Sequence, residues 1–136
     1  MMTCWKWKRY FSSNHLNLLI SSWRRPHPQS VHIDTKVTGH YCNSILATRE
    51  AVRKGYDDAI MLDVDGYVAQ GPGASIFFEN GGRLYTAPMG SIFPGITRQT
   101  MIDIAGSMGI EVVEKKFGAE DIMKIDGAFL LSLIHI

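Results

Sequence analysis

The stretch Ala59-Ile-Met-Leu-Asp-Val-Asp-Gly-Tyr-Val-Ala69 decides the fold class of this 136-residue chain. Its first half, residues 59–64, is a short apolar run typical of a buried strand. Asp65-Gly66 follows, and this dipeptide favours a two-residue hairpin turn because glycine readily adopts the left-handed backbone conformation. Residues 67–69 then predict the returning strand. A hairpin at this place indicates antiparallel pairing, which differs from the strict strand–helix alternation of a Rossmann domain.

Two helices are predicted on either side of this hairpin. The first is expected to run to Lys54, with Asn43 or Ser44 as its N-cap and Gly55 after its end. The second is expected to begin at a Thr97 cap and to end at Gly109. The residues expected on their buried faces are Ile45, Leu46, Ala51 and Val52 in the first helix, and Met101, Ile102, Ile104, Ala105 and Met108 in the second.

Strand patterns fill most of the remaining chain. Strands are predicted at 19–23, 75–79, 83–86, 110–114 and 128–131, and a short helix at 119–123. Strands and helices therefore mix without a regular alternation and without internal repeats. The sequence predicts the α/β class, in its mixed α+β form.

Two short motifs carry candidate chemistry. Lys36-Val-Thr-Gly-His-Tyr41 places a lysine and a tyrosine around a glycine, and Gly95-Ile-Thr-Arg98 opens the second predicted helix. Free backbone N–H groups at a helix start, together with a threonine hydroxyl, can bind a phosphate. A lysine with a separate phosphate site is what a pyridoxal phosphate (PLP) enzyme requires. From spacing alone, two plainer interpretations stay open: Lys36 as a solvated surface charge, and Thr97 as an ordinary helix cap.

Five segments of the chain together resemble one known family. They are Ile20-Ser-Ser-Trp-Arg-Arg-Pro-His-Pro28, Lys36-Val-Thr-Gly-His-Tyr-Cys-Asn-Ser44, Ala59-Ile-Met-Leu-Asp63, Gly66-Tyr-Val-Ala-Gln-Gly-Pro-Gly73 and Phe93-Pro-Gly-Ile-Thr-Arg98. These segments resemble the branched-chain amino-acid aminotransferases, which are class IV enzymes of PLP fold type IV. The resemblance implies that residues 20–130 form part of the large, cofactor-carrying domain of such an enzyme.

The resemblance also implies an activity. It is the PLP-dependent transfer of an amino group between leucine, isoleucine or valine and 2-oxoglutarate, in a cytoplasmic homodimer with small-molecule amino-acid and 2-oxo-acid substrates. Because part of the family's cofactor site lies outside the matching residues, we expect the 136-residue fragment alone to be inactive. D-amino-acid aminotransferase and aminodeoxychorismate lyase, which share the fold, are the first alternative. A non-catalytic truncated product that binds no cofactor is the second.

Site residues follow from the resemblance, position by position. Lys36 matches the lysine that forms the Schiff base and moves the substrate proton, and we expect burial to help it act as a free amine. Tyr41 matches the tyrosine that hydrogen-bonds the cofactor's phenolic oxygen. Ile96 and Thr97 match the positions that hold its phosphate, and Phe93 matches an apolar residue beside its ring.

Gln70 departs from the family pattern, which has a glutamate at this position. In the family that carboxylate keeps the pyridine nitrogen of PLP protonated. An amide can hydrogen-bond the nitrogen but supplies no charge to hold its proton, so Gln70 implies a slow or divergent enzyme, unless it is a one-base error for glutamate. Arg98 follows Ile96 and Thr97 in the motif, and the sequence leaves open whether it belongs to the site or has a structural role. The Arg24-Arg25 pair is expected to be solvated or salt-bridged at the surface, with a charge at the substrate entrance as the alternative.

Charge and cysteine content exclude several other classes of function. Residues 1–33 contain no acid, whereas residues 34–136 hold thirteen acids against nine Lys and Arg, a net charge of −4. This acidic part argues against nucleic-acid binding. Cys4 and Cys42 have no metal-binding spacing, and no apolar run approaches the ~20 residues of a membrane span. The composition predicts no metal site and no structural disulfide, which suits a reducing cytoplasm.

Both ends of the chain differ from the family. Residues 1–19 are basic and aromatic, and we interpret them as non-family sequence that is not native coding sequence, with a transit peptide or membrane-surface anchor as the alternative. Residues 131–136, Leu-Ser-Leu-Ile-His-Ile, resemble the translated end of a sequencing adapter. We interpret them as an artefactual tail, with an ordinary buried strand end as the alternative.

Overall fold

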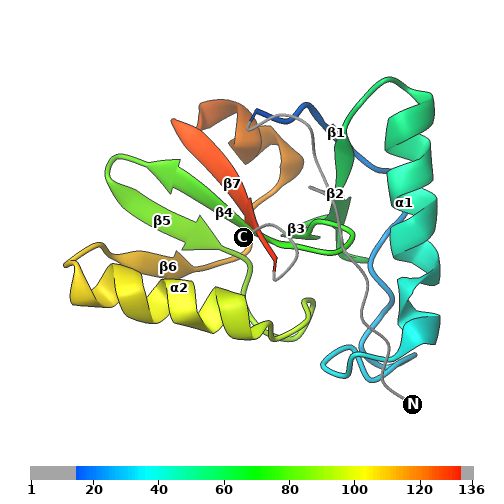
Figure 1. The fold of residues 1–136 in the computed structure, drawn as a ribbon, viewed down its shortest axis with the longest axis horizontal. Coiled ribbons are helices and arrows are strands. Elements are labelled where there is room, and N and C mark those ends of the chain that lie inside the picture. The colour runs from blue at the N-terminus through cyan, green and yellow to red at the C-terminus, as the bar shows by residue number, and fades with distance from the viewer. Residues whose placement is uncertain (1–14, 133–136) are drawn as a thin grey trace, which may run out of the picture.

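The computed structural model describes residues 15–132, which form two β-sheets and two long helices (Figure 1). The elements are β1 (Leu18–Ile20), η1 (Thr38–Tyr41), α1 (Cys42–Arg53), β2 (Asp58–Leu62), β3 (Val68–Gln70), β4 (Ser75–Asn80), β5 (Arg83–Thr86), α2 (Ile96–Ser107), β6 (Val112–Glu114), η2 (Ala119–Lys124) and β7 (Gly127–Leu131). One sheet has the order β1-β2-β3 and the other β6-β5-β4-β7. Figure 1 shows α1 beside the first sheet and α2 beside the second. The predicted mixed α/β class is confirmed.

The three-stranded sheet forms around the predicted hairpin. β1 runs parallel to β2, and β3 returns antiparallel to it. In the turn between β2 and β3, Gly66 has a φ of +92°, and the N–H of Asp63 donates to the carbonyl of Tyr67 (2.7 Å). β2 is buried along its whole length because β1 and β3 flank it and helix α1 packs against it.

Helix α1 contacts β2 through small side chains. Ala47 and Ala51 are completely buried in this contact. Small residues let the helix backbone approach the sheet closely, which leaves larger neighbours on the outer flanks. Ile45 is 57 % exposed and Val52 is 60 % exposed, so their predicted burial is wrong.

The four-stranded sheet has an apolar core on each face. Phe77 of β4 is buried beside Ala105 of α2, and its ring stacks on that of Phe129 in β7 with centroids 5.5 Å apart. On the opposite face, Phe78 meets Phe117 edge to face at 4.8 Å. Because successive strand residues point to opposite faces, the two adjacent phenylalanines serve two different cores.

Helix α2 buries a narrower face than predicted. Ala105 is buried, and Met101 and Ile102 are partly buried against the sheet. These positions lie three and four residues apart, on one stripe of the helix. Ile104 falls outside that stripe, and Met108 lies just past the end of the helix; both are exposed, so their predicted burial is wrong.

Neither long helix begins with the predicted side-chain cap. α1 follows directly on η1, a turn that was not predicted, and neither Asn43 nor Ser44 caps it. Asn43 instead donates its side-chain N–H to the carbonyl of Arg24 (2.9 Å). α2 begins after Gly95, and Thr97 lies inside its first turn. The N–H groups at the start of both helices therefore have no side-chain cap, and the side chains there are not used for capping.

The ends of the helices agree with the predictions. Gly55 follows α1 with a φ of +82°, and Gly109 follows α2 with a φ of +73°. Both values lie in the left-handed region that favours glycine after a helix. Within residues 15–132, no helix is long and apolar enough to cross a membrane. Residues 1–14 and 133–136 hold most of the two terminal segments interpreted above as foreign, and they lie outside the described residues.

Candidate active site

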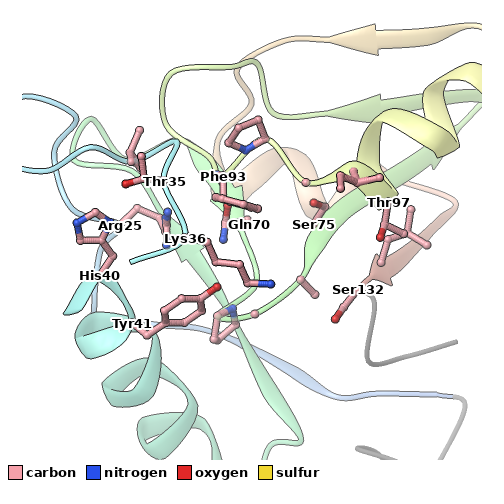
Figure 2. A pocket seen from close by; sticks show the side chains of 18 residues that line it. Arg25, Thr35, Lys36, His40, Tyr41, Gln70, Ser75, Phe93, Thr97 and Ser132 are labelled. Carbon is pink, nitrogen blue, oxygen red and sulfur yellow. The ribbon is translucent and has the colours of Figure 1, made fainter. Parts of the chain in front are cut away.

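One cavity of about 420 Å³ brings all the predicted site residues together (Figure 2). Its walls come from the segment between β1 and α1, the loop between β3 and β4, the start of α2 and the end of β7. The residues that line it are Arg25, Ile33, Thr35, Lys36, His40, Tyr41, Gln70, Pro72, Gly73, Ala74, Ser75, Phe93, Pro94, Gly95, Ile96, Thr97, Leu131 and Ser132.

Lys36 and Tyr41 enter the cavity from the same side. Tyr41 is the last residue of the η1 turn and stands directly before α1. Figure 2 shows both side chains pointing into the cavity. The Lys36 ammonium lies 6.0 Å from the centroid of the Phe93 ring, close enough for a weak cation–π attraction. Lys36 is exposed, so the expectation that it is buried is wrong, and its flexible stem can move the amine within the cavity.

Gln70 is buried, and its amide joins two walls of the cavity. The side-chain oxygen accepts a hydrogen bond from the Phe93 N–H (2.8 Å), and the side-chain nitrogen donates to the Gly71 carbonyl (3.3 Å). With its oxygen occupied, the amide has N–H donors to offer to other groups. A ligand atom that meets this N–H would be a hydrogen-bond acceptor.

The start of α2 forms the opposite end of the cavity. Gly95 is its N-cap, no side chain caps it, and no acid lies in its first turn. The backbone N–H groups of Ile96 and Thr97 have no partners within the helix, and the helix dipole is positive here. Ser75 adds a hydroxyl that lies 3.6 Å from the position a Cβ on Gly95 would take. This end of the cavity can accept an anion.

Arg98 has a structural role, one of the two possibilities that the sequence left open. Its guanidinium is buried, pairs with Glu114 (2.8 Å) and donates to the carbonyl of Ala87 (2.9 Å). These bonds tie the first turn of α2 to the end of β5 and to β6. Arg98 does not line the cavity.

Sequence reasoning missed the residues at the Tyr41 end of the cavity. Arg25 was expected at the surface, yet it is only 6 % exposed and lines the cavity, whereas Arg24 is exposed. Burial lowers the pKa of Arg25, and attraction to Tyr41 partly offsets that effect. His40 also lines the cavity, and its buried Nδ1 has no hydrogen-bond partner within residues 15–132. The sequence feature that bears on Arg25 is Pro26, which favours an extended backbone at the residue before it.

A metal centre has no counterpart in this part of the chain. Within residues 15–132, no three His, Cys, Asp or Glu side chains lie close enough together to hold a metal ion. The polar groups that line the cavity are an amine, a guanidinium, an imidazole, a phenol, an amide, hydroxyls and the start of a helix.

Comparison with known proteins shows the family to which this chain belongs. The model of the family described as amino-transferase class IV matches residues 2–135. The chain belongs to the class IV aminotransferase family. The branched-chain-amino-acid aminotransferase of Escherichia coli (strain K12) is 35 % identical to it over 135 residues, which cover 96 % of this chain and 44 % of the relative.

Solved structures of class IV aminotransferases have the same fold. The branched-chain aminotransferase of Thermoproteus uzoniensis, solved with norvaline, matches with a TM-score of 0.90 and 40 % identity over 94 % of this chain and 43 % of that one. The branched-chain amino acid aminotransferase of Thermobaculum terrenum, solved in its PLP form, matches with a TM-score of 0.87 and 34 % identity over 94 % and 42 %. The chain thus spans less than half the length of these relatives. The predicted family is confirmed, and class IV aminotransferases use PLP.

Proposed function

We propose that this chain carries part of the active site of a branched-chain amino-acid aminotransferase. The reaction is the PLP-dependent transfer of an amino group between leucine, isoleucine or valine and 2-oxoglutarate. The observation that carries the proposal is the convergence of Lys36, Tyr41, Gln70 and the uncapped start of α2 on one cavity. Relatives described as branched-chain aminotransferases support the substrate class. The resemblance of the sequence supports homodimers and a cytoplasmic location.

The cavity fits PLP in size and charge. Its volume of about 420 Å³ lies within the range of roughly 300–1,000 Å³ that holds small-molecule ligands. The start of α2 suits a phosphate, because its N–H groups are unpartnered in the helix and its first turn holds no acid. The amine of Lys36 lies between this end and Tyr41. A helix start that suits a phosphate, together with an amine and a phenol, suits a phosphorylated aromatic aldehyde.

Each wall of the cavity would hold a different part of the cofactor. The N–H groups of Ile96 and Thr97 and the Thr97 hydroxyl would bind the phosphate. Phe93 would pack beside the ring, and the Tyr41 hydroxyl would donate to its phenolic oxygen. The amide N–H of Gln70 would donate to the ring nitrogen, which therefore has to be an unprotonated acceptor.

Lys36 would move the reacting proton. When bound, PLP supplies an aldehyde carbon that takes up the amino group and a ring that accepts electrons from the substrate α-carbon. The Lys36 amine would take the proton from that α-carbon and return it at the aldehyde carbon of the cofactor. The lysine stem is exposed and flexible, which would let one amine serve both proton transfers.

Borohydride trapping tests the proposal on this chain. The protein is incubated with PLP, reduced with borohydride and digested, and the modified lysine is identified by mass spectrometry. We expect the adduct to map mainly to Lys36 and to be lost in Lys36→Ala. Lys124→Ala, which removes an exposed lysine on η2, should leave the adduct in place. An adduct spread evenly over the surface lysines would refute the proposal.

A further inference from the structure

We propose that Arg25 binds an anionic oxygen that a ligand brings to the Tyr41 end of the cavity. This inference rests on the proposed function, because the anion belongs to the cofactor or to the substrate. Arg25 lines the cavity together with His40 and Tyr41 (Figure 2). Within residues 15–132, its buried Nε has no hydrogen-bond partner and no carboxylate pairs with its guanidinium.

The backbone on both sides of Arg25 is fixed. Its own N–H donates to the carbonyl of Leu62 at the end of β2 (2.9 Å), and the carbonyl of Arg24 accepts from Asn43 of α1 (2.9 Å). Pro26 follows and restricts the backbone further. Arg25 is therefore held between the sheet and the helix that carries Tyr41 at its start.

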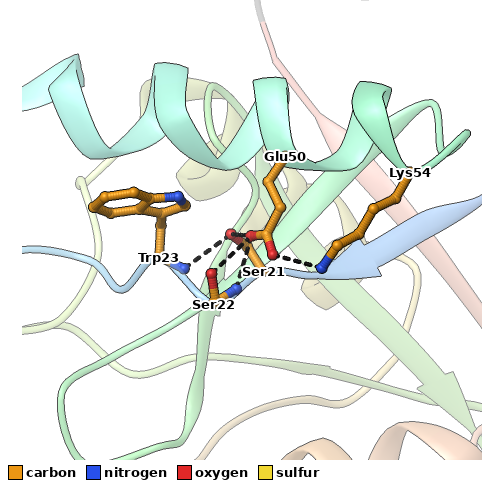
Figure 3. A network of polar contacts seen from close by, with 5 residues as sticks. All are labelled: Ser21, Ser22, Trp23, Glu50 and Lys54. Carbon is orange, nitrogen blue, oxygen red and sulfur yellow. Dashed lines mark hydrogen bonds and ion pairs between the residues drawn. The ribbon is translucent and has the colours of Figure 1, made fainter.

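A second network holds the chain just before Arg25. The carboxylate of Glu50, in the last turn of α1, accepts hydrogen bonds from the Ser21 hydroxyl (2.7 Å) and the Ser22 N–H (2.9 Å) (Figure 3). The Trp23 N–H in turn donates to the Ser21 hydroxyl oxygen (3.0 Å). Hydrogen bonds thus fix the segment from β1 to Arg25. Within residues 15–132, however, the Arg25 guanidinium at its end has no acceptor.

A buried charge without a partner is unfavourable, so its retention calls for a ligand that supplies the partner. Burial of Arg25 lowers its pKa, in keeping with a desolvated cation. The buried Nδ1 of His40 is a second unpartnered polar atom at this end, within residues 15–132. The start of α2 attracts one anion at the far end of the cavity, and Arg25 attracts another here.

Two ligand groups have the required chemistry. One is the ionised ring oxygen of a pyridoxal-type cofactor, and the other is the carboxylate of the amino-acid or 2-oxo-acid substrate. Both are anionic oxygens that a guanidinium binds through charge-assisted hydrogen bonds. Ligands that carry one group and lack the other can distinguish them.

The test measures dissociation constants by ligand-observed NMR with molecules that cannot react with lysine. Pyridoxine 5'-phosphate carries the ring oxygen, 3-O-methylpyridoxine 5'-phosphate has that oxygen blocked, and 4-methylvalerate, added with pyridoxine 5'-phosphate, supplies a carboxylate. We expect Arg25→Met to weaken one of the two anionic ligands by at least about tenfold. Arg24→Met, a change at the exposed neighbour, should stay within about twofold of the wild type.

The pattern of losses identifies the anion. A loss for pyridoxine 5'-phosphate that disappears with the methylated analogue assigns the ring oxygen to Arg25, and a loss confined to 4-methylvalerate assigns the substrate carboxylate. Unchanged constants in Arg25→Met, or equal losses for all three ligands, overturn this inference and leave the proposed function standing. Failure of the wild type to bind pyridoxine 5'-phosphate overturns both.

Thermal unfolding without ligand gives an independent readout. If Arg25 is kept for a ligand, Arg25→Met removes an unpaired buried charge and should melt at the same temperature as the wild type or higher. A structural arginine would behave in the opposite way. A melting temperature clearly below those of the wild type and Arg24→Met would overturn the inference.

Discussion

The Ser21 hydroxyl donates to the Glu50 carboxylate at 2.7 Å, which joins the end of β1 to the last turn of α1. Lys54 bonds the other oxygen of the same carboxylate (2.7 Å), and the Ser22 N–H donates to the oxygen that Ser21 uses. The bond from Lys54, followed by those from Ser21 and Ser22, favours the ionised form and lowers the pKa of Glu50 from 4.5 to about 2.

This depressed pKa predicts how stability depends on pH. The contribution of Glu50 is fully present above the unfolded-state pKa of 4.5, and it is lost as the pH falls toward about 2. Glu50→Gln should therefore lower the free energy of unfolding clearly at about pH 6 and by less at about pH 3. Urea unfolding at both pH values measures this. Glu111→Gln, a change in the exposed pair with Arg83, is the control, and a deficit of Glu50→Gln that is independent of pH would contradict the prediction.

Gln70→Glu should destabilise the chain in the absence of cofactor. A carboxylate can still accept from the Phe93 N–H, but it cannot donate to the Gly71 carbonyl as the amide does. Leaving buried groups unpaired costs about 1–3 kcal/mol at neutral pH. At low pH the acid gains a proton to donate, so the loss should shrink. Chemical unfolding measures both, with Gln29→Glu at an exposed position as the control, and an equal stability of Gln70→Glu and wild type would refute this account.

The ion pair of Arg98 should matter far more than that of Arg83. Arg98→Met leaves the carbonyl of Ala87 without its donor and Glu114 without its partner, which should cost about 2–4 kcal/mol. Arg83→Met breaks a pair with Glu111 whose two side chains are both largely exposed, and it should cost less than about 1 kcal/mol. Urea denaturation of the two variants compares them directly. Equal losses would show that burial does not set the difference.

Two glycines should respond to alanine in opposite directions. Both have open space where a Cβ would be placed, so only the backbone distinguishes them. Gly66→Ala puts a side chain at a φ of +92° and should destabilise the hairpin by about 1 kcal/mol or more. Gly106→Ala, near the end of α2, should stabilise by about 0.4–1 kcal/mol. Thermal melts check the signs, and a shift in the same direction for both would be contrary to expectation.

Local signals in the sequence predicted most of the elements but not what they bury. The hairpin at Gly66 and the helix ends at Gly55 and Gly109 depend on the backbone of single residues, and they formed as expected. The exposure of Ile45 and Val52 depends on how closely α1 approaches β2, which no local pattern encodes. Apolar periodicity locates a helix more reliably than the side of it that faces the sheet.

The candidate site could be predicted only because the chain resembles a family. Lys36, Gln70 and Phe93 lie far apart in the sequence, and spacing alone left Lys36 as a surface charge. The structure brings them to one cavity, while their roles stay predictions. Arg25 was missed because its burial depends on a strand and a helix that meet on either side of it. Matching single positions to a family motif cannot show that the buried charge of Arg25 lacks a partner.

Strand β7, which completes the second sheet, also constrains the order in which the chain can fold. Asn80 pairs with Arg83 across a tight turn, whereas Ser75 pairs with Leu131 across most of the C-terminal half of the chain. Closing so long a loop costs more conformational entropy, so β7 should join after the β4–β5 hairpin has formed. The end of β7 lines the cavity, which therefore takes shape late in folding. A ligand of this cavity would recognise only the finished fold, and it would slow unfolding without accelerating folding.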